Sequence, residues 1–348
     1  MYKSCNLILH GLCFFTGAVA SCCNSPVDQI GNQKPPLLFE NYKGELVPPE
    51  ELFKKIREHS NKFKNGGCPE SCKNCCFIQE QDWDEGEYIN EVTITNFSCC
   101  NADCIYCANN LSSNERFNDY YNILPILKYY KDEGVLVKGC EFHISGGEFT
   151  IYQECDEILK EFGMTDYAKI IISSNCIRYS DALTKSMEIG STYIIHSLDC
   201  GSRETFKKIK RVDAFDKVID NLKKYTFNAK QQLTLKYIII PNVNDNLDEF
   251  GKFLNIAASL QVRRIEIEIE GRYARMVNYK ISPYFVELAE KMKQMAIPYG
   301  FYVGFFPFLR QAMHNNVYKK QNGIQNFCSK LRIRNDNSIK KLYISQKY

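Results

Sequence analysis

The sequence predicts an α/β fold in which a parallel sheet is joined by crossover helices, preceded by a cysteine-rich segment. Three observations predict it. Strand-like runs alternate with helical periods from residue 88 onward, some strands are continuously apolar as at 237–240, and the cysteines gather near the N-terminus. The pattern leaves an open sheet and a partial barrel as alternatives. With 348 residues, 45% of them hydrophobic, the chain can bury a full core.

The elements follow in order along the chain. Residues 24–50 are rich in Pro, Asn and Gln and predict an extended connector, whereas 50–63 have helical spacing that ends at Asn65-Gly66-Gly67. Strands are then expected at 88–96, 138–145, 168–173, 192–198, 233–240, 264–269 and 301–306. Helices are expected at 117–133, 152–162, 180–189, 203–226, 246–260 and 283–296. We therefore expect a cysteine-rich segment at 1–87, an α/β core at 88–310 and a C-terminal tail at 311–348.

Charge and hydropathy exclude two classes of partner. The net charge of +3 gives no sign of a dedicated nucleic-acid binder, and no run of 18 apolar residues predicts a membrane span. Residues 1–23 have some features of a secretory signal, with Lys3 before an apolar run and Ala18-Val19-Ala20 as a cleavage site. Because the positive region is one lysine, and His10 and cysteines interrupt the run, we interpret the segment as folded and the protein as cytoplasmic.

Seventeen cysteines, twelve of them in the first 107 residues, indicate metal ligation more than disulfides, because disulfide scaffolds are much shorter. The run Cys100-Asn-Ala-Asp-Cys104-Ile-Tyr-Cys107 follows the first strand of the alternating region, where parallel folds place their chemistry. Three thiolates at this spacing can hold one [4Fe–4S] cluster and leave one iron open. A structural zinc site with Cys99 as fourth ligand is the alternative.

This run resembles the CxxxCxxC signature of the radical SAM superfamily, including the aromatic Tyr106 before the last cysteine. About 40 residues later, a predicted strand runs into Gly146-Gly147-Glu148, which looks like the GGE motif of that superfamily. The segment 172–176 resembles a third-strand end, with Cys176 in place of the usual glycine. Further similar segments are 197–199, 206–211 and 240–245, so the resemblance covers about residues 88–310.

The resemblance implies a partial (β/α)6 TIM-like barrel and a radical SAM enzyme. Such an enzyme cleaves S-adenosylmethionine at a [4Fe–4S] cluster, and the 5′-deoxyadenosyl radical then removes a hydrogen atom from the substrate. It implies a reductant such as flavodoxin or ferredoxin and a peptide or small-molecule substrate. The cluster ligands would be Cys100, Cys104 and Cys107. The residues expected near the cofactor are Tyr106, Gly146, Gly147, Glu148, Ser174, Asn175 and Asp199.

A second cysteine group precedes the core at Cys68-Pro-Glu-Ser-Cys72-Lys-Asn-Cys75-Cys76. Taken with the N-terminus it resembles half of the auxiliary-cluster pattern of SPASM and twitch domains, although those modules usually follow the barrel. The resemblance implies a second [4Fe–4S] cluster on Cys5, Cys22, Cys72 and Cys75, with Cys13, Cys23, Cys68 and Cys76 as rival ligands. A Cys₄ zinc ribbon is the alternative.

Three function classes follow. The first is an oxidoreductase or modifying enzyme acting on a peptide or carbohydrate-linked substrate, with the auxiliary cluster taking up an electron. The second is a redox-neutral epimerase or isomerase with Cys176 or Cys200 as hydrogen donor, although such a thiol is more often a small buried hydrophobe. The third is a non-catalytic zinc-binding scaffold. The sequence also places Glu266, Glu268 and Glu270 on one strand face, either inside a barrel or in solvent, and predicts a core or near-core position for His143.

Overall fold

A ten-stranded sheet forms the centre of the protein in the computed structural model, with strand order β12-β11-β10-β9-β8-β7-β6-β2-β3-β4. Strands β6 (Ile89–Thr95) to β12 are parallel to one another, and β2 (Gly11–Phe15) pairs parallel with β6. The structure describes residues 2–22, 36–65, 67, 72, 79–81, 84, 86–107, 121–277, 280–305, 308–310, 312 and 313.

The N-terminal segment contributes strands to this same sheet. Strand β2 pairs parallel with β6, and β3 (Ala18–Ala20) and β4 (Leu37–Glu40) continue the sheet antiparallel. Strand β1 (Tyr2–Ser4) pairs separately with β5 (Gln79–Gln81). Two helices complete the segment, α1 (Asn6–His10) and α2 (Pro49–Lys64). The folded interpretation of the first residues is therefore confirmed for 2–22, but β4 lies within the expected connector, because buried Leu38 packs into the core.

The alternation from residue 88 is confirmed by the structure. After β6, the parallel strands are β7 (Leu136–Ile144), β8 (Ala168–Ser173), β9 (Thr192–Ser197), β10 (Leu233–Ile239), β11 (Arg264–Ile269) and β12 (Tyr302–Phe305). The helices between and after them are α3 (Leu124–Asp132), α4 (Cys155–Ile158), α5 (Asp181–Ile189), α6 (Arg203–Lys210), α7 (Phe215–Ala229), α8 (Leu247–Ser259), α9 (Gly271–Met276) and α10 (Pro283–Ala296).

One long predicted helix, 203–226, is in fact two helices. Helix α6 ends because Arg211 adopts a left-handed conformation, with φ of 53°, that no further helical turn can follow. Helix α7 begins four residues later and covers the next part of the sheet. Helix α4 also differs from expectation, since it passes directly into a π-helical turn at Leu159–Gly163.

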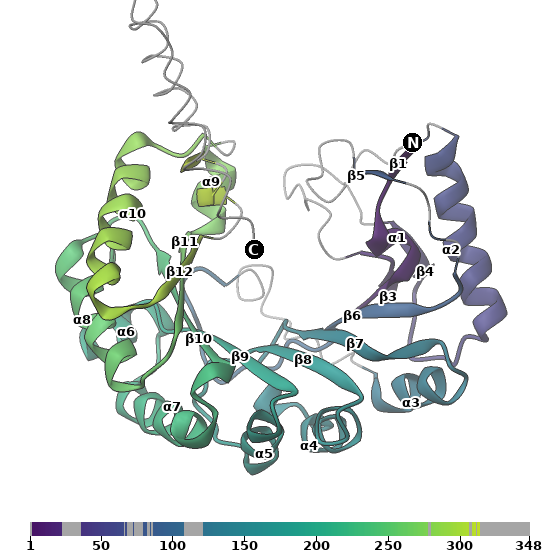
Figure 1. Ribbon diagram of the computed structural model, residues 1–348, viewed down its shortest axis with the longest axis horizontal. Helices are drawn as coiled ribbons and strands as arrows, with labels where there is room; N and C mark the ends of the chain where they lie inside the picture. Colours follow the sequence, from purple (N-terminus) through teal and green to yellow (C-terminus); the bar gives the residue numbers. More distant parts are fainter. Residues whose placement is uncertain are drawn as a thin grey trace, which may run out of the picture.

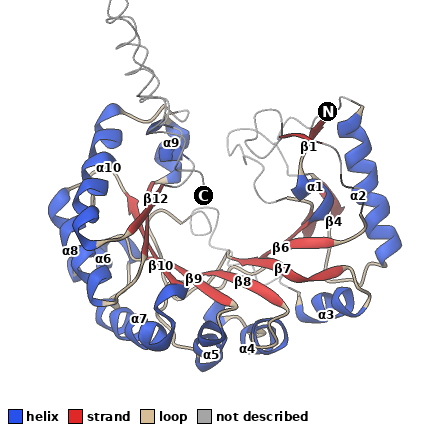
Figure 2. Ribbon diagram, in the orientation of Figure 1, coloured by secondary structure: helices blue, strands red, loops and turns tan. Residues whose placement is uncertain are grey.

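The parallel strands curve into an open arc with helices on the convex side, which confirms the partial TIM-like barrel (Figure 1; Figure 2). Alternate residues of each strand face the helices: Tyr237 of β10 packs edge-on against Phe250 and Phe253 of α8. The residues between them therefore face the concave interior. His143 belongs to this interior face, is partly exposed, and has its Nε2 3.5 Å from Glu141 Oε2, so of the two expected positions it lies outside the core.

Within the described part of the chain, no helix is long and apolar enough to cross a bilayer. The division of the chain at residues 87 and 310 stays a prediction. The tail at 311–348 lies almost entirely outside the described residues.

His196 is a fully buried titratable group on the helix-facing side of β9. Its Nδ1 donates to the carbonyl oxygen of Ser174 over 3.0 Å, and its Nε2 has no partner among the described residues. Burial, reinforced by the charge of Lys210, lowers the pKa of His196 to about 4. The ring is therefore neutral in the folded protein at neutral pH.

We expect His196 to contribute to acid unfolding. Its pKa in the unfolded chain is near 6.5, so the unfolded state gains a proton first as the pH falls. The contribution of His196 to the free energy of unfolding is fully present above pH 6.5. It decreases by roughly 3 kcal/mol as the pH falls from 6.5 to 4. The free energy of unfolding in urea, measured between pH 6.5 and 4, should fall more steeply for wild type than for His196→Phe. An identical pH slope in both proteins would contradict the prediction.

Candidate active site

Residues 100–107 form the cysteine loop, which lies at the carboxyl end of β6. Backbone hydrogen bonds join this loop to the end of α6. The amide of Asp103 donates to the carbonyl of Lys210 over 3.0 Å, and the amide of Ile105 donates to Ile209 over 2.9 Å. On its other side, the Arg272 guanidinium donates to the carbonyl of Ile105 over 2.5 Å. The loop thus has a defined course fixed by segments more than 100 residues away.

The cysteines of this region differ from all other described ones in exposure. The structure describes twelve cysteines, of which eight are buried and four are partly exposed. The partly exposed four are Cys99, Cys100, Cys104 and Cys107. Burial, with smaller contributions from Glu148 and from the thiols of Cys104 and Cys107, raises the pKa of Cys100 to about 11. The three thiols are therefore close enough to interact electrostatically.

This donor set fits an iron–sulfur cluster. Among the described residues, no three His, Cys, Asp or Glu side chains converge on a point that one metal ion would occupy. Cysteines that hold a four-iron cluster bind different irons, so their sulfur atoms need not converge in that way. In addition, Asn175 Nδ2 lies 3.5 Å from Cys100 Sγ, as a hydrogen bond to a ligand sulfur requires.

The turn Gly146-Gly147-Glu148 packs directly against the residues that precede the cysteine loop. The amide of Gly147 donates to the carbonyl oxygen of Phe97 over 3.0 Å, and the amide of Glu148 donates to the carbonyl oxygen of Cys99 over 2.7 Å. A Cβ on Gly147 would lie 2.2 Å from the Cys99 carbonyl oxygen, and Gly146 has φ of 107°. Within the protein, the glycines therefore allow this turn to approach the cysteine loop.

Glu148 is buried and joins this turn to the end of β8. Its Oε1 accepts hydrogen bonds from the amide and hydroxyl of Thr150 and from the hydroxyl of Ser174, and its Oε2 accepts from the amide of Asn175. Burial raises the pKa of Glu148 although these four donors oppose the shift. The carboxylate thereby places Asn175 beside Cys100.

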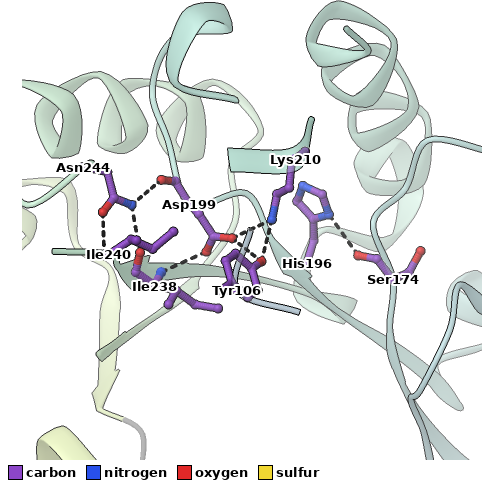
Figure 3. Close-up of polar contacts among 8 residues, drawn as sticks. All are labelled: Tyr106, Ser174, His196, Asp199, Lys210, Ile238, Ile240 and Asn244. Carbon is purple, nitrogen blue, oxygen red and sulfur yellow. Dashed lines mark hydrogen bonds and ion pairs between the residues drawn. The ribbon is translucent and has the colours of Figure 1, made fainter. Parts of the chain in front are cut away.

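A buried ion pair lies on the other side of the cysteine loop (Figure 3). Lys210 Nζ lies 2.5 Å from Asp199 Oδ2, and their side chains are 3% and 0% exposed. The Tyr106 hydroxyl donates to the same oxygen over 2.6 Å, and Lys210 also donates to that hydroxyl over 2.6 Å. Burial disfavours the charge on Lys210, but the Asp199 carboxylate outweighs it and raises the pKa of Lys210. We call Tyr106, Asp199 and Lys210 the anchor triad.

Asp199 has no free oxygen for a ligand in this arrangement. Its Oδ1 accepts from the amide of Ile238 over 2.8 Å, and Oδ2 belongs to the anchor triad. Asn244, also fully buried, donates to the carbonyls of Asp199 and Ile238 and accepts from the amide of Ile240 (Figure 3). These contacts fasten the ends of β9 and β10 together, so Asp199 and Tyr106 hold the scaffold of the site.

Cys176 and Cys200, the suggested hydrogen donors, are both fully buried. Burial raises the pKa of each thiol well above its ordinary value. Cys176 has φ of 55°, a left-handed conformation that favours glycine and explains the glycine that the resemblance places there. Neither thiol reaches an exposed surface in this structure.

The suggested auxiliary ligands Cys5, Cys22 and Cys72 are buried, and Cys75 lies outside the described residues. Cys5 and Cys72 pack in one small apolar cluster with Ile8 and Phe63. Cys22 lines a small hollow with the rival ligand Cys13. Leu7 borders both groups. The ligand set of this second site stays a prediction.

Lys210, Arg272 and Asn244 hold the site, but sequence reasoning gave them no role. Lys210 and Asn244 stand in the segments 206–211 and 240–245 that carried the resemblance, which was the available signal. Their partners lie on other strands and loops, so spacing along the chain could not pair them. Arg272 carried no signal in the sequence.

Comparison with known proteins gives a family match. Residues 94–254 match the family model of the Radical SAM superfamily. A probable GTP 3′,8-cyclase of Saccharolobus islandicus (strain M.14.25 / Kamchatka #1) is 28% identical over 186 residues, or 52% of this chain and 57% of that protein. A protein of Brachyspira hyodysenteriae (strain ATCC 49526 / WA1) named GTPase Obg is 26% identical over 204 residues, 56% of this chain but 29% of that protein. The chain thus spans little more than half of the cyclase.

Among solved structures, Streptococcus suis SuiB bound to precursor peptide SuiA superposes with a TM-score of 0.52. It is 17% identical and the match covers 80% of this chain and 58% of SuiB. At this identity the likeness concerns the fold, and it agrees with the open arc of parallel strands described above.

We expect Asp199→Asn to destabilise the protein by about 3–5 kcal/mol, because it leaves the Lys210 charge buried without a counterion. Chemical unfolding measures the loss. The double variant Asp199→Asn/Lys210→Met should lose less than Asp199→Asn alone. Asp213→Asn is the control, since it removes the partner of the exposed Arg203 and should change little. Equal losses for the buried and the exposed pair would contradict the anchor role.

Gly147→Ala should lower the free energy of unfolding by about 1–3 kcal/mol, because its Cβ would overlap the backbone of Cys99. Gly251→Ala is the matched control, since its Cβ lies 3.6 Å from its nearest neighbour within helix α8. That control should be neutral or stabilising. Unfolding free energies that change equally in both variants would contradict the close approach.

Proposed function

We propose that this chain, whose residues 94–254 match the Radical SAM superfamily, is a radical SAM enzyme in which Cys100, Cys104 and Cys107 hold a [4Fe–4S] cluster that cleaves S-adenosylmethionine. When bound, the cluster supplies an electron to S-adenosylmethionine and generates the 5′-deoxyadenosyl radical that removes a substrate hydrogen atom. We propose an oxidoreductase or modifying enzyme for a peptide or carbohydrate-linked substrate, reduced by a flavodoxin or ferredoxin.

One observation carries the proposal. Of the described cysteines, only the four at 99–107 are partly exposed, and they lie at the carboxyl edge of the parallel strands. Catalytic side chains of parallel barrels come from this edge. A buried structural thiol would be inaccessible there, whereas a cluster ligand must reach the interior where a cofactor binds.

The chain's own residues would position the cofactor and the cluster. The anchor triad and Arg272 fix the loop, so the three thiols keep one arrangement. Asn175 donates to Cys100 Sγ and is itself placed by Glu148. Gly146 and Gly147 expose backbone beside the cysteine loop, where the methionine end of S-adenosylmethionine would lie.

A second [4Fe–4S] cluster on Cys5, Cys22, Cys72 and Cys75 is part of the proposal, as an electron acceptor for an oxidised substrate. The packing of Cys5 with Cys72, and of Cys22 beside Cys13, supports a shared N-terminal site. The redox-neutral alternative would need Cys176 or Cys200 to reach the substrate, and the burial of both gives it no support. The zinc scaffold alternative would leave S-adenosylmethionine uncleaved.

Iron and sulfide per chain, measured after anaerobic reconstitution, test the proposal. Wild type should hold about eight irons, and the variant with Cys100, Cys104 and Cys107 all changed to Ala about four. Under dithionite, 5′-deoxyadenosine should form from S-adenosylmethionine with wild type only. Four irons in wild type and none in the variant would reject the second cluster alone. Zinc in place of iron, with no 5′-deoxyadenosine, would reject the enzyme.

A further inference from the structure

The concave face of β10 and β11 carries charged residues that neither the cysteine loop nor the anchor triad uses. Lys236 of β10 lies beside Glu266 of β11 in register, and Glu268 follows on the same face. Their neighbours in the strands, Tyr237 and Ile267, are fully buried on the opposite side, beneath the helices. The three charged side chains therefore face the interior of the barrel.

Glu266 has a buried oxygen without a partner. Its Oε1 accepts from Arg264 Nη2 over 2.7 Å, while its Oε2 has no hydrogen bond among the described residues. The side chain is 6% exposed, and the Oε2 atom itself is buried. Burying an unpaired carboxylate oxygen costs stability. Gly304 of β12 leaves room for this side chain, since a Cβ there would lie 3.4 Å from Glu266 Cγ.

Glu270, which directly follows β11, has hydrogen-bond donors on both of its carboxylate oxygens. Its Oε1 accepts from the amide and guanidinium of Arg272, and its Oε2 accepts from the amide of Tyr273. Glu266 and Glu270 are 5% and 6% exposed, so they differ in hydrogen bonding and not in burial. A purely structural carboxylate at 266 would be expected to have donors in the same way.

Glu268, the next residue on this face, forms a long ion pair with Lys236. Its Oε2 lies 4.0 Å from Lys236 Nζ, beyond hydrogen-bond distance, and its Oε1 accepts from the amide of Ile269 over 3.2 Å. Burial raises the pKa of Glu268 to about 7, with Glu266 adding to the rise and Lys236 and Arg310 opposing it. A further cation nearby would favour the ionised form of this group.

From this geometry we propose that Glu266 and Glu268 form a subsite that binds an ammonium group of the substrate. The inference rests on the proposed function, since it assigns a substrate to the barrel interior. Glu266 Oε2 and Glu268 Oε2 accept hydrogen bonds from the ammonium group, which supplies the donor that Glu266 Oε2 lacks among the described residues. Arg264, half-exposed, donates to Oε1 of Glu266 and leaves its Oε2 without a donor among the described residues, whereas Oε2 of Glu268 lies 4.0 Å from Lys236 Nζ.

The location suits a substrate that meets the cofactor. Lys236 is in register with Ser197 of β9, two residues before Asp199 of the anchor triad. The subsite thus lies on the interior wall next to the strand end that supports the cysteine loop. It is separate from the proposed ligands of both clusters, so substitutions there leave the thiols intact.

A stability comparison tests the subsite without any ligand. Glu266→Met should keep or raise the midpoint of thermal unfolding, because it removes a buried unpaired oxygen. Glu270→Met should lower that midpoint by about 4 °C or more, because it breaks satisfied hydrogen bonds. If Glu266→Met lowers the midpoint of thermal unfolding as much as Glu270→Met does, Glu266 is a structural residue and the proposal is overturned.

Binding tests the ligand class on the reconstituted protein with S-adenosylmethionine present. The probes are Nα-acetyl-L-lysine amide, which carries an ammonium group, and Nα-acetyl-L-norleucine amide, which lacks one. Equilibrium dialysis should show tighter binding of the lysine probe to wild type. Binding should weaken about tenfold in Glu266→Gln and in Glu268→Gln, the effect of one charge-assisted hydrogen bond. The exposed Glu287→Gln is the control and should leave binding unchanged.

Equal binding of the two probes, binding of neither, or unchanged binding in both Glu→Gln variants would overturn the ammonium subsite. Neither measurement depends on cleavage of S-adenosylmethionine. A protein that binds the lysine probe through Glu266 but lacks iron would reject the proposed function alone. A protein that forms 5′-deoxyadenosine but does not distinguish the probes would reject the subsite alone.

Discussion

The buried ion pair between Lys210 and Asp199 is the interaction on which the site depends. Each charge loses its hydration, and an isolated one would be strongly destabilising at 3% or less exposure. The Tyr106 hydroxyl and the amide of Ile238 complete the hydrogen bonding, so the pair is satisfied within the protein. Because Tyr106 lies between Cys104 and Cys107, the same pair determines where those two thiols lie.

The carboxyl edge of the sheet concentrates the strained and buried polar groups of the protein. Cys176, Asp199 and Asn242 follow β8, β9 and β10, and each has a positive φ that non-glycine residues rarely adopt. Glu148 and Asn244 then satisfy the backbone of these turns from buried positions. Such strain costs free energy and persists where surrounding contacts over-determine it, which is typical of functional sites.

The two faces of the sheet carry different kinds of side chain. On the convex side, Tyr237, Phe250 and Phe253 pack as a continuous apolar layer that supplies the stability of the fold. The concave side carries charged side chains such as Glu268 and Lys236, whose burial is unfavourable unless they are paired. The fold thus concentrates its stability in one layer and leaves the other free to bind.

Much of this architecture could be predicted from local pattern. Strand and helix periods repeat because each element buries one face or both, and β8, β9 and β11 lie within a residue of their predicted bounds. The break at Arg211 was missed because the flanking helices share one helical period, while a single left-handed residue separates them. Strand β4 was missed because its short apolar run is surrounded by residues typical of a connector.

The motifs of the site were also local: the spacing of Cys100, Cys104 and Cys107 and the turn at Gly146 and Gly147 can be read directly. By itself, the sequence predicted the fold class, the resemblance to the superfamily whose model residues 94–254 match, and the candidate thiols, because these depend on periodicity and short spacings. Tertiary structure alone decided that Lys210 meets Tyr106, 104 residues away, and that Glu266 lacks a donor that Glu270 has. Those outcomes depend on how strands curve and register, which brings together side chains that no local pattern relates.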